Sequence, residues 1–263
     1  MPLRVIICNQ RMKLSGRTAI MGILVFAGRE LTAPQIIALA APLGMTATNV
    51  KSYLTRMVAE GSLTRRGAAR LSFYEPSSVQ HARIDDLRQR MTPMTDPWDS
   101  SWVVVAGFLP KDRMQKERLN SALWIDGFRM VNGAFLRPAW PLPWALERAR
   151  WYADLMEGVC VRGHLETAPE YLRDLFGVSG LDAEAAVLAE KLDEIGVPDS
   201  PRGCYAAMLE LTGEVVQLLS HNPRFPPELV SGEGLRNLAE SFRKLEASLA
   251  PGGREFLATI LGE

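Results

Sequence analysis

The 263-residue sequence has few of the residues from which metal and redox sites are built. Its three cysteines, Cys8, Cys160 and Cys204, are far apart and odd in number, and they form no C-x-x-C pair. This usage favours reduced thiols in a cytoplasmic protein. The three histidines are equally scattered, so no metal-ligand spacing is visible.

Common catalytic fingerprints are also missing. The sequence contains no G-x-S-x-G, H-E-x-x-H, Walker A or dinucleotide-binding pattern. We therefore expect a protein that is not an enzyme and that needs no metal or other cofactor. A triad assembled only in space is left open, because such residues need not be close in sequence.

Long apolar runs are absent as well. The apolar stretch Thr18–Gly28 comes after a basic segment and has the length of a signal-peptide core, but it is too short to span a membrane. The residues after Gly28 continue the pattern of a helical domain, which favours a buried first helix. We expect no membrane association.

The net charge is zero, with 30 basic and 30 acidic residues, but the two signs are unevenly distributed. Residues 1–90 carry 13 Lys and Arg against 5 Asp and Glu, a balance of +8. Residues 91–263 carry 17 against 25, a balance of −8. This asymmetry predicts that only the first part of the chain meets a polyanion.

The basic part has the pattern of three helices followed by two strands. Gly16–Ala27 is the first predicted helix, and Thr32 begins a short second helix that stops near Gly44. A third helix starts after Thr46, and two short strands come next, with a turn at residues 67–68. This is the order of a winged helix-turn-helix, in which the last helix enters the DNA major groove.

The third helix has two different sides. Its apolar residues recur at helical spacing, whereas the other side is polar and cationic, with no acid before Glu60. A solvated polar face is the alternative, but helix order and charge favour DNA contact. Short side chains that could reach base edges are Thr48, Asn49 and Ser52. Side chains expected on phosphates or bases are Lys51, Thr55 and Arg56, with Arg65, Arg66 and Arg70 on the wing.

The rest of the chain predicts a mixed architecture. A polar connecting helix is followed by the order β-α-β-β-α-β, with Asn132-Gly133 as a hairpin turn. Helical patterns then continue from Glu166, including a helix with Asp182 at its start and a last helix from about Gly234 to Leu249. The predicted class is α+β, with a winged helix at 1–76, a linker helix at 77–97, a ferredoxin-like domain at 98–166 and a helical domain at 167–263.

Three separated segments carry a family resemblance: "VKSYLTRMVAEGSLTRRG" with a wing ending "FYE", then "DPWDSSWVVVAGF", then "HNPRFPPELV". Together they resemble the PaaX family, the repressors of bacterial phenylacetate degradation genes, over essentially the whole chain. The resemblance implies a DNA-binding homodimer that is released from its operator by an aryl acyl-CoA thioester.

Tryptophans cluster in the middle domain. They usually mark a core or an interface, but a pocket for a flat aromatic acyl group would also use them, with arginines facing phosphate or carboxylate. The candidate effector-binding residues are Trp102, Trp124, Arg137, Trp140, Trp144 and Arg148.

The function predicted from the sequence is transcriptional regulation, with double-stranded operator DNA, an aromatic acid or aryl-CoA effector and a second copy of the chain as partners. The alternative is a metal-dependent nuclease, or another enzyme, with a nucleic-acid-binding arm. A nuclease would place a metal-binding aspartate at the end of the first middle-domain strand. Asp112 lies near that place, but a proline precedes it and Lys111 adjoins it, so we interpret it as a helix cap.

Overall fold

The computed structural model describes residues 14–67, 71–90, 97–140, 142–165, 174–221, 225–226, 229 and 232–263. The chain forms two compact units, and each draws on segments far apart in sequence. The first unit takes residues 1–83, 196–215 and 246–263, and the second takes 84–195 and 216–245. Both units mix helices with antiparallel sheet, so the predicted α+β class is confirmed. The predicted division into four consecutive segments stays a prediction.

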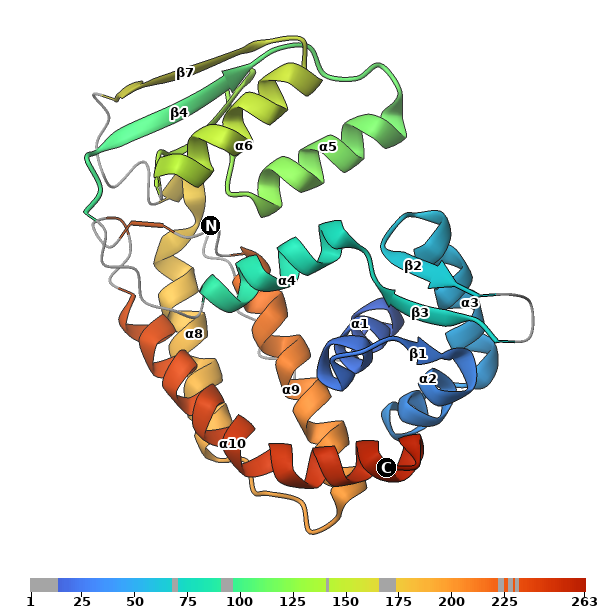
Figure 1. The fold of residues 1–263 in the computed structure, drawn as a ribbon. Helices are drawn as coiled ribbons and strands as arrows, with labels where there is room; N and C mark the ends of the chain where they lie inside the picture. Colours follow the sequence, from blue (N-terminus) through green and yellow to red (C-terminus); the bar gives the residue numbers. More distant parts are fainter. Residues whose placement is uncertain are drawn as a thin grey trace. The chain divides into compact units, whose positions relative to one another are not determined.

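The first unit begins with three helices and a small sheet (Figure 1). The helices are α1 (Gly16–Ala27), α2 (Ala33–Ala40) with the 3-10 turn η1 (Ala41–Leu43), and α3 (Ala47–Ala59). The strands are β1 (Leu31–Thr32), β2 (Leu63–Arg66) and β3 (Phe73–Pro76), in the order β1-β3-β2. The sequence did not predict β1, because two residues are too few to show a strand period.

Local signals set these boundaries. α3 begins after Thr46, as predicted, and the Thr46 hydroxyl caps this start by accepting from the Asn49 N–H at 3.3 Å. Gly44 supplies the left-handed turn before it, with φ 74°. A polar helix, α4 (Ser78–Arg90), comes after the wing, where the sequence predicted a connecting helix.

The core of the first unit is completed from the far end of the sequence. Buried side chains of α1, α2 and α3 pack with Tyr205 and Leu209 of α9 (Pro201–His221). Phe256, Leu257 and Ile260 of α10 (Glu233–Leu261) pack against the same cluster. These contacts were not predicted from the sequence. Helical periodicity shows that a helix has an apolar face, but not which distant segment packs against that face.

The predicted end of the last helix, near Leu249, is wrong. α10 continues through Pro251 to Leu261. A proline inside a helix removes one backbone hydrogen bond and usually ends the helix. Here the turns beyond it bury Phe256 and Leu257 against the first unit's core, and this burial favours continuation.

The second unit contains a four-stranded antiparallel sheet. Its elements are β4 (Ser101–Ala106), α5 (Arg113–Ile125), β5 (Arg129–Val131), β6 (Ala134–Pro138), α6 (Leu142–Leu155) and β7 (Val159–His164). The strand order is β5-β6-β4-β7. The predicted hairpin is present, with positive φ at both Asn132 and Gly133.

The two faces of this sheet are covered differently. One face packs against α5 and α6 through Val103, Val105 and Phe135 (Figure 1). The other carries Trp102 and Leu136 against aromatic and aliphatic side chains of the later segments.

The second unit also includes α8 (Val178–Asp193). The predicted start of this helix at Asp182 is wrong, because it begins at Val178. The Asp182 carboxylate instead accepts from the Leu235 N–H near the start of α10, at 3.4 Å. An acidic side chain at a helix start is therefore present, but it serves a different helix.

Candidate nucleic-acid interface

α3 separates a buried side from an exposed side. Val50, Leu54 and Met57 are buried in the first unit's core, as the apolar stripe predicted. The six polar or cationic residues predicted to face DNA are all exposed: Thr48, Asn49, Lys51, Ser52, Thr55 and Arg56. The helix thus presents donors and cations to solvent while its other side holds it to the unit.

The contacts on this face are few and local. The Thr55 hydroxyl donates to the Lys51 carbonyl at 3.0 Å, a bond within the helix. The Arg56 guanidinium lies over the Tyr53 ring, 4.5 Å from its centroid. Glu60, just after the helix, pairs with Arg17 at 2.8 Å. The acid nearest to the face is therefore already matched by a cation.

A tight turn leads from α3 into the wing. Gly61 has φ 70°, and the Ser62 N–H donates to the Met57 carbonyl at 2.8 Å. Arg65 and Arg66 on β2 are both exposed. Arg65 and Arg66 therefore lie on the strand that comes directly after α3 and this turn. Arg70 lies outside the described residues.

The two wing arginines have different partners. Arg65 Nε donates to the Ser72 hydroxyl at 2.9 Å. Arg66 Nε donates to a Glu75 carboxylate oxygen at 3.0 Å, and a second guanidinium nitrogen contacts the same oxygen. The hydrogen bond that Arg66 donates to Glu75, together with the negative charges of Glu75 and Glu30, raises the pKa of Arg66. A phosphate would have to replace Glu75 to engage Arg66 fully.

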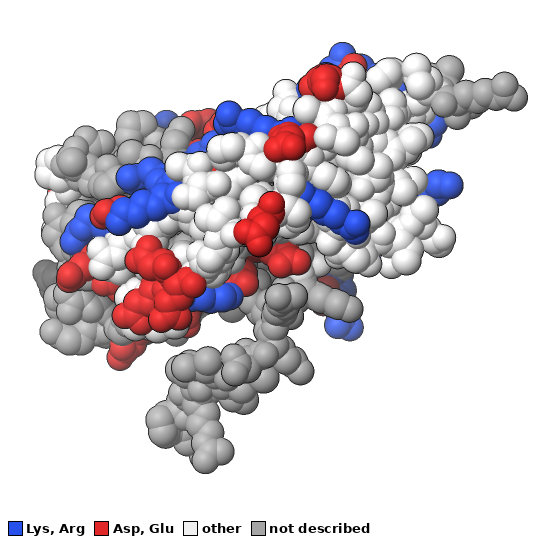
Figure 2. Space-filling model, turned by 90° about the horizontal axis from the view of Figure 1, so that it is seen from below, with Lys and Arg blue, Asp and Glu red and all other residues white. Residues whose placement is uncertain are grey.

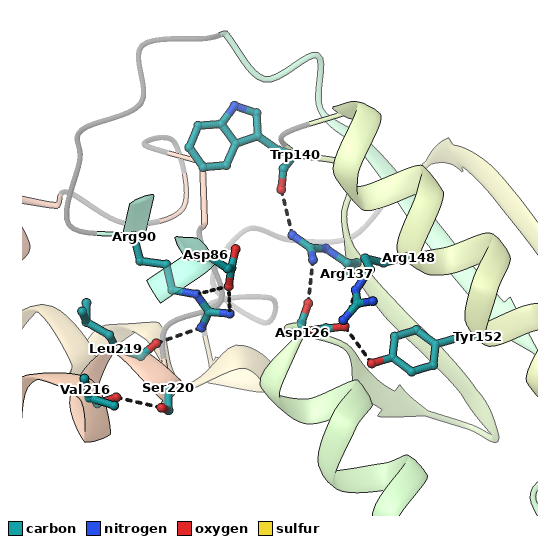
Figure 3. A network of polar contacts seen from close by, with 10 residues as sticks. All are labelled: Asp86, Arg90, Asp126, Arg137, Trp140, Arg148, Tyr152, Val216, Leu219 and Ser220. Atoms are coloured by element: carbon teal, nitrogen blue, oxygen red, sulfur yellow. Dashed lines mark hydrogen bonds and ion pairs between the residues drawn. The ribbon is translucent and has the colours of Figure 1, made fainter. Parts of the chain in front are cut away.

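Three of the six predicted effector residues, Arg137, Trp140 and Arg148, belong to an internal network of the second unit (Figure 3). Arg137 is only 1% exposed. It donates to the carbonyls of Asp126, Trp140 and Pro138 at 2.6, 2.8 and 3.0 Å, and its guanidinium lies 4.4 Å from the Trp144 ring centroid. Arg137 is thus a cross-link between β6 and the turn after α5.

A buried carboxylate extends this network. One oxygen of Asp126 accepts from Arg148 Nε at 2.8 Å and from the Tyr152 hydroxyl at 2.7 Å. Sequence reasoning missed this role, because Asp126 and Tyr152 are 26 residues apart. An acid directly after a predicted helix, in a segment rich in arginine, is the only signal in the sequence that could have suggested it.

The four tryptophans among the predicted effector residues differ in exposure. Trp102 and Trp140 are buried, Trp144 is partly buried, and Trp124 is 39% exposed. Arg129 lies over the Trp124 ring at 4.5 Å, and burial lowers the pKa of this guanidinium to about 10. The effector role of all six residues stays a prediction.

The second unit also has a surface hollow, of about 260 Å³, between α8 and α10. Glu190, Asp193, Glu240 and Lys244 line it, and Lys244 pairs with Glu240 at 2.9 Å. None of the predicted effector residues lies there.

Asp112 is a helix cap, as predicted. Its carboxylate accepts from the Gln115 N–H at 2.8 Å at the start of α5. Over the described ranges, no group of three or more His, Cys, Asp and Glu is placed to hold a metal ion. No helix in the described part of the chain is long and apolar enough to cross a membrane.

Residues 19–78 match the model of the PaaX-like protein family. This match supports a PaaX family assignment. It runs from α1 to the first residue of α4, so it contains α3 and the wing. The two later segments that carried the resemblance in sequence lie outside the matched range.

The solved structure of the uncharacterised protein Rv0674 from Mycobacterium tuberculosis resembles this chain. The two share 22% sequence identity with a TM-score of 0.56, over 92% of this chain and 99% of that one. This likeness concerns the fold alone. No curated protein matches the chain.

Charges of both signs mix on the surface. Figure 2 shows one face on which basic and acidic side chains occur together. The +8 and −8 halves of the sequence therefore do not give this face a single sign. Exposed cations are nevertheless grouped locally, with Lys51 and Arg56 on α3 and Arg65 and Arg66 on β2.

Proposed function

We propose that the chain is a DNA-binding transcriptional regulator whose first unit is a winged helix-turn-helix. The PaaX-like match suggests a transcriptional regulator at the family level. The observation that carries the proposal is the exposed, acid-free face of α3, held to the core by Val50, Leu54 and Met57. A rigid helix with one free polar side is what major-groove reading requires.

Each side chain has a role in this proposal. Asn49 and Ser52 hydrogen-bond base edges, while Lys51 and Arg56 contact phosphates or bases. Arg65 adds a backbone contact from the wing, and Arg66 exchanges Glu75 for a phosphate. Because one winged helix reads few base pairs, the operator is two-fold symmetric and the protein binds it as a dimer.

The test is a fluorescence-anisotropy titration of promoter DNA from the protein's own locus at several salt concentrations. Lys51→Ala should weaken binding to all DNA sequences similarly. It should also reduce the slope of log binding constant against log salt concentration by about 0.9. Asn49→Ala should change sequence preference by about 1–3 kcal/mol at one base pair. Lys111→Ala removes the same charge from the exposed surface of the second unit and should change neither quantity. Absence of binding by the wild type would refute the proposal.

In this proposal the second unit contains a ferredoxin-like domain that binds an effector. The protein is then a ligand-responsive repressor that acts in the cytoplasm. The second unit's sheet order β5-β6-β4-β7 fits that arrangement. The effector is an aromatic acid or its CoA thioester, which favours a conformation that does not bind DNA. Support comes from the sequence resemblance and from the exposed Trp124 beside Arg129.

A panel of free acids and thioesters tests this part, scored by thermal shift and by loss of a gel-shifted complex. We expect one ligand to raise the melting temperature and release DNA. If none does so at millimolar concentration, the effector role is wrong, while DNA binding stands.

The regulator performs no catalytic step in this proposal. Asp112 caps α5, so Asp112→Ala should cost about 0.5–2 kcal/mol of stability and leave DNA binding unchanged. Magnesium- or manganese-dependent cleavage of DNA or RNA that disappears in this variant would show a nuclease instead.

A further inference from the structure

The surface hollow of about 260 Å³ between α8 and α10 lies wholly within the second unit. Because a water occupies ~30 Å³ in the liquid, this space equals roughly nine waters, which is room for a small organic molecule. Gly234 brings the starts of the two helices together, since a Cβ at this position would lie 2.0 Å from the Asp182 carbonyl oxygen. Further along α8, Ala186 and Ala189 are too small to fill the gap, and the hollow lies there.

Most of the charge around the hollow is negative, and part of it is unmatched. Glu240 pairs with Lys244 at 2.9 Å. Glu190 and Asp193 are exposed, and neither carboxylate has a hydrogen bond or ion pair among the described residues. The hydrogen bond to Glu240, the charge of Glu240 and, to a smaller extent, that of Asp193 raise the pKa of Lys244. Asp193 therefore lies near enough to attract an ammonium group in this space.

A buried hydroxyl also lines the hollow. Ser241 of α10 is only 5% exposed. Its hydroxyl has no hydrogen-bond partner within the part of the chain that the structure describes. Leaving a buried polar group unmatched is unfavourable, so a donor bound in the hollow gains a hydrogen bond that the protein alone does not supply. Ser241 thus points to a ligand independently of the acidic side chains.

The spacing of the two unmatched carboxylates favours an organic cation with separated charges. Glu190 and Asp193 are three positions apart on α8, so they are neighbours on its surface, with ~5–6 Å between Cβ atoms. Over the described ranges they belong to no group of three or more His, Cys, Asp and Glu placed to hold a metal ion. Two ammonium groups joined by a methylene chain can each meet one carboxylate, while the chain lies against Ala186 and Ala189.

We propose that the hollow between α8 and α10 binds an aliphatic diamine or polyamine. One ammonium group pairs with Glu190 and another with Asp193, and one of them donates to the Ser241 hydroxyl. Because both carboxylates are exposed, the affinity is modest and falls as salt screens the charges. The site needs neither DNA nor an aryl effector, so it does not rest on the proposed function.

The experiment is isothermal titration calorimetry of the full chain with 1,4-diaminobutane at low salt, without DNA. We expect one site per chain with a Kd of about 1 mM or tighter. 1-Aminobutane has the same carbon chain but a single ammonium group, so it should bind about 2–5-fold more weakly. Equal affinity for the two amines would show that the second carboxylate takes no part, and absence of diamine binding would overturn the proposal.

Substitutions around the hollow test which side chains hold the diamine. Glu190→Gln and Asp193→Asn should each weaken binding about 2–5-fold. Ser241→Ala should weaken it about 3–10-fold, because the ligand then loses a buried acceptor. Glu184→Gln is the matched control: it removes the same charge from an exposed position of α8 that does not line the hollow, and it should bind like the wild type.

Two results would assign the binding to something else. Equal weakening in Glu184→Gln and Glu190→Gln would mean that the diamine is attracted to the acidic surface in general. Magnesium that binds alone, with the same dependence on Glu190 and Asp193 and in competition with the diamine, would make the hollow a metal site. DNA binding is measured separately by anisotropy, so the two proposals fail separately.

Discussion

α3 and the arginine-tryptophan network of the second unit are both rich in groups that recognise ligands, but they use them differently. On α3, Lys51, Asn49 and Ser52 face solvent. In the second unit, Arg137 is buried and donates to three backbone carbonyls. Residue type alone does not separate a binding surface from an internal support. The two are distinguished by how many acceptors within the protein each side chain already contacts.

The difference has an energetic meaning. A buried guanidinium that donates to three carbonyls stabilises a turn, and losing it leaves those carbonyls unpaired. An exposed lysine contributes little to folding and can give its charge to a phosphate. Each region therefore predicts its own mutational signature.

The largest effect should come from Arg137→Met. The variant removes the donor to three carbonyls, so we expect the free energy of unfolding to fall by about 3–5 kcal/mol. Urea denaturation followed by circular dichroism measures it. Lys51→Met is the control and should stay within about 0.5 kcal/mol of the wild type. Wild-type stability of Arg137→Met would show that this network is free to serve a ligand.

Asp126→Asn should have the next largest effect. The change puts an amide where one carboxylate oxygen accepts from both Arg148 and Tyr152. We expect a loss of about 1.5–3 kcal/mol. A double-mutant cycle with Tyr152→Phe should show coupling, since both changes act on one oxygen. Purely additive losses would mean that the two contacts do not form together.

A smaller effect should come from Glu75→Gln, in the opposite direction. The variant weakens the pair that holds Arg66, so non-specific DNA affinity at low salt should rise about 3–10-fold and the gain should fade as salt increases. Glu117→Gln, which loosens Arg113 in the second unit, is the control. Unchanged affinity would place Arg66 away from DNA.

The smallest effect should come from Tyr205→Phe. The Tyr205 hydroxyl is fully buried and has no hydrogen-bond partner in the described structure, and burial raises its pKa. Removing an unmatched hydroxyl is neutral or stabilising, so we expect 0 to about 1 kcal/mol of added stability. A clear loss of stability, measured by thermal unfolding, would mean that the hydroxyl has a partner in solution.

Local features were predictable from the sequence because their causes are local. The start of α3 after Thr46, the Asn132-Gly133 hairpin and the Asp112 cap each depend on a few neighbouring residues, and all three are present. The apolar stripe of α3 also predicted which of its sides is buried.

The identity of distant partners could not be predicted. Three contacts depend on how distant segments of the chain fold back together: Asp126 with Tyr152, Asp182 with Leu235, and Leu209 with the α1 core. For the same reason, Arg137 was a plausible ligand contact in sequence and is a buried donor to three backbone carbonyls in the structure. The glutamate partner of Arg66 was likewise visible only in space.

The end of α10 has a consequence for how the protein is made. Ile20 and Leu24 are synthesised early, but Phe256 and Leu257, which pack against the same core, emerge only after most of the chain, ~10–50 s later at ~5–20 residues per second. During that interval the apolar core of the first unit lacks the side chains of α10 that later pack against it. A nascent chain stalled before Phe256 should therefore attract chaperones that bind exposed apolar surface, and one that includes Leu261 should not.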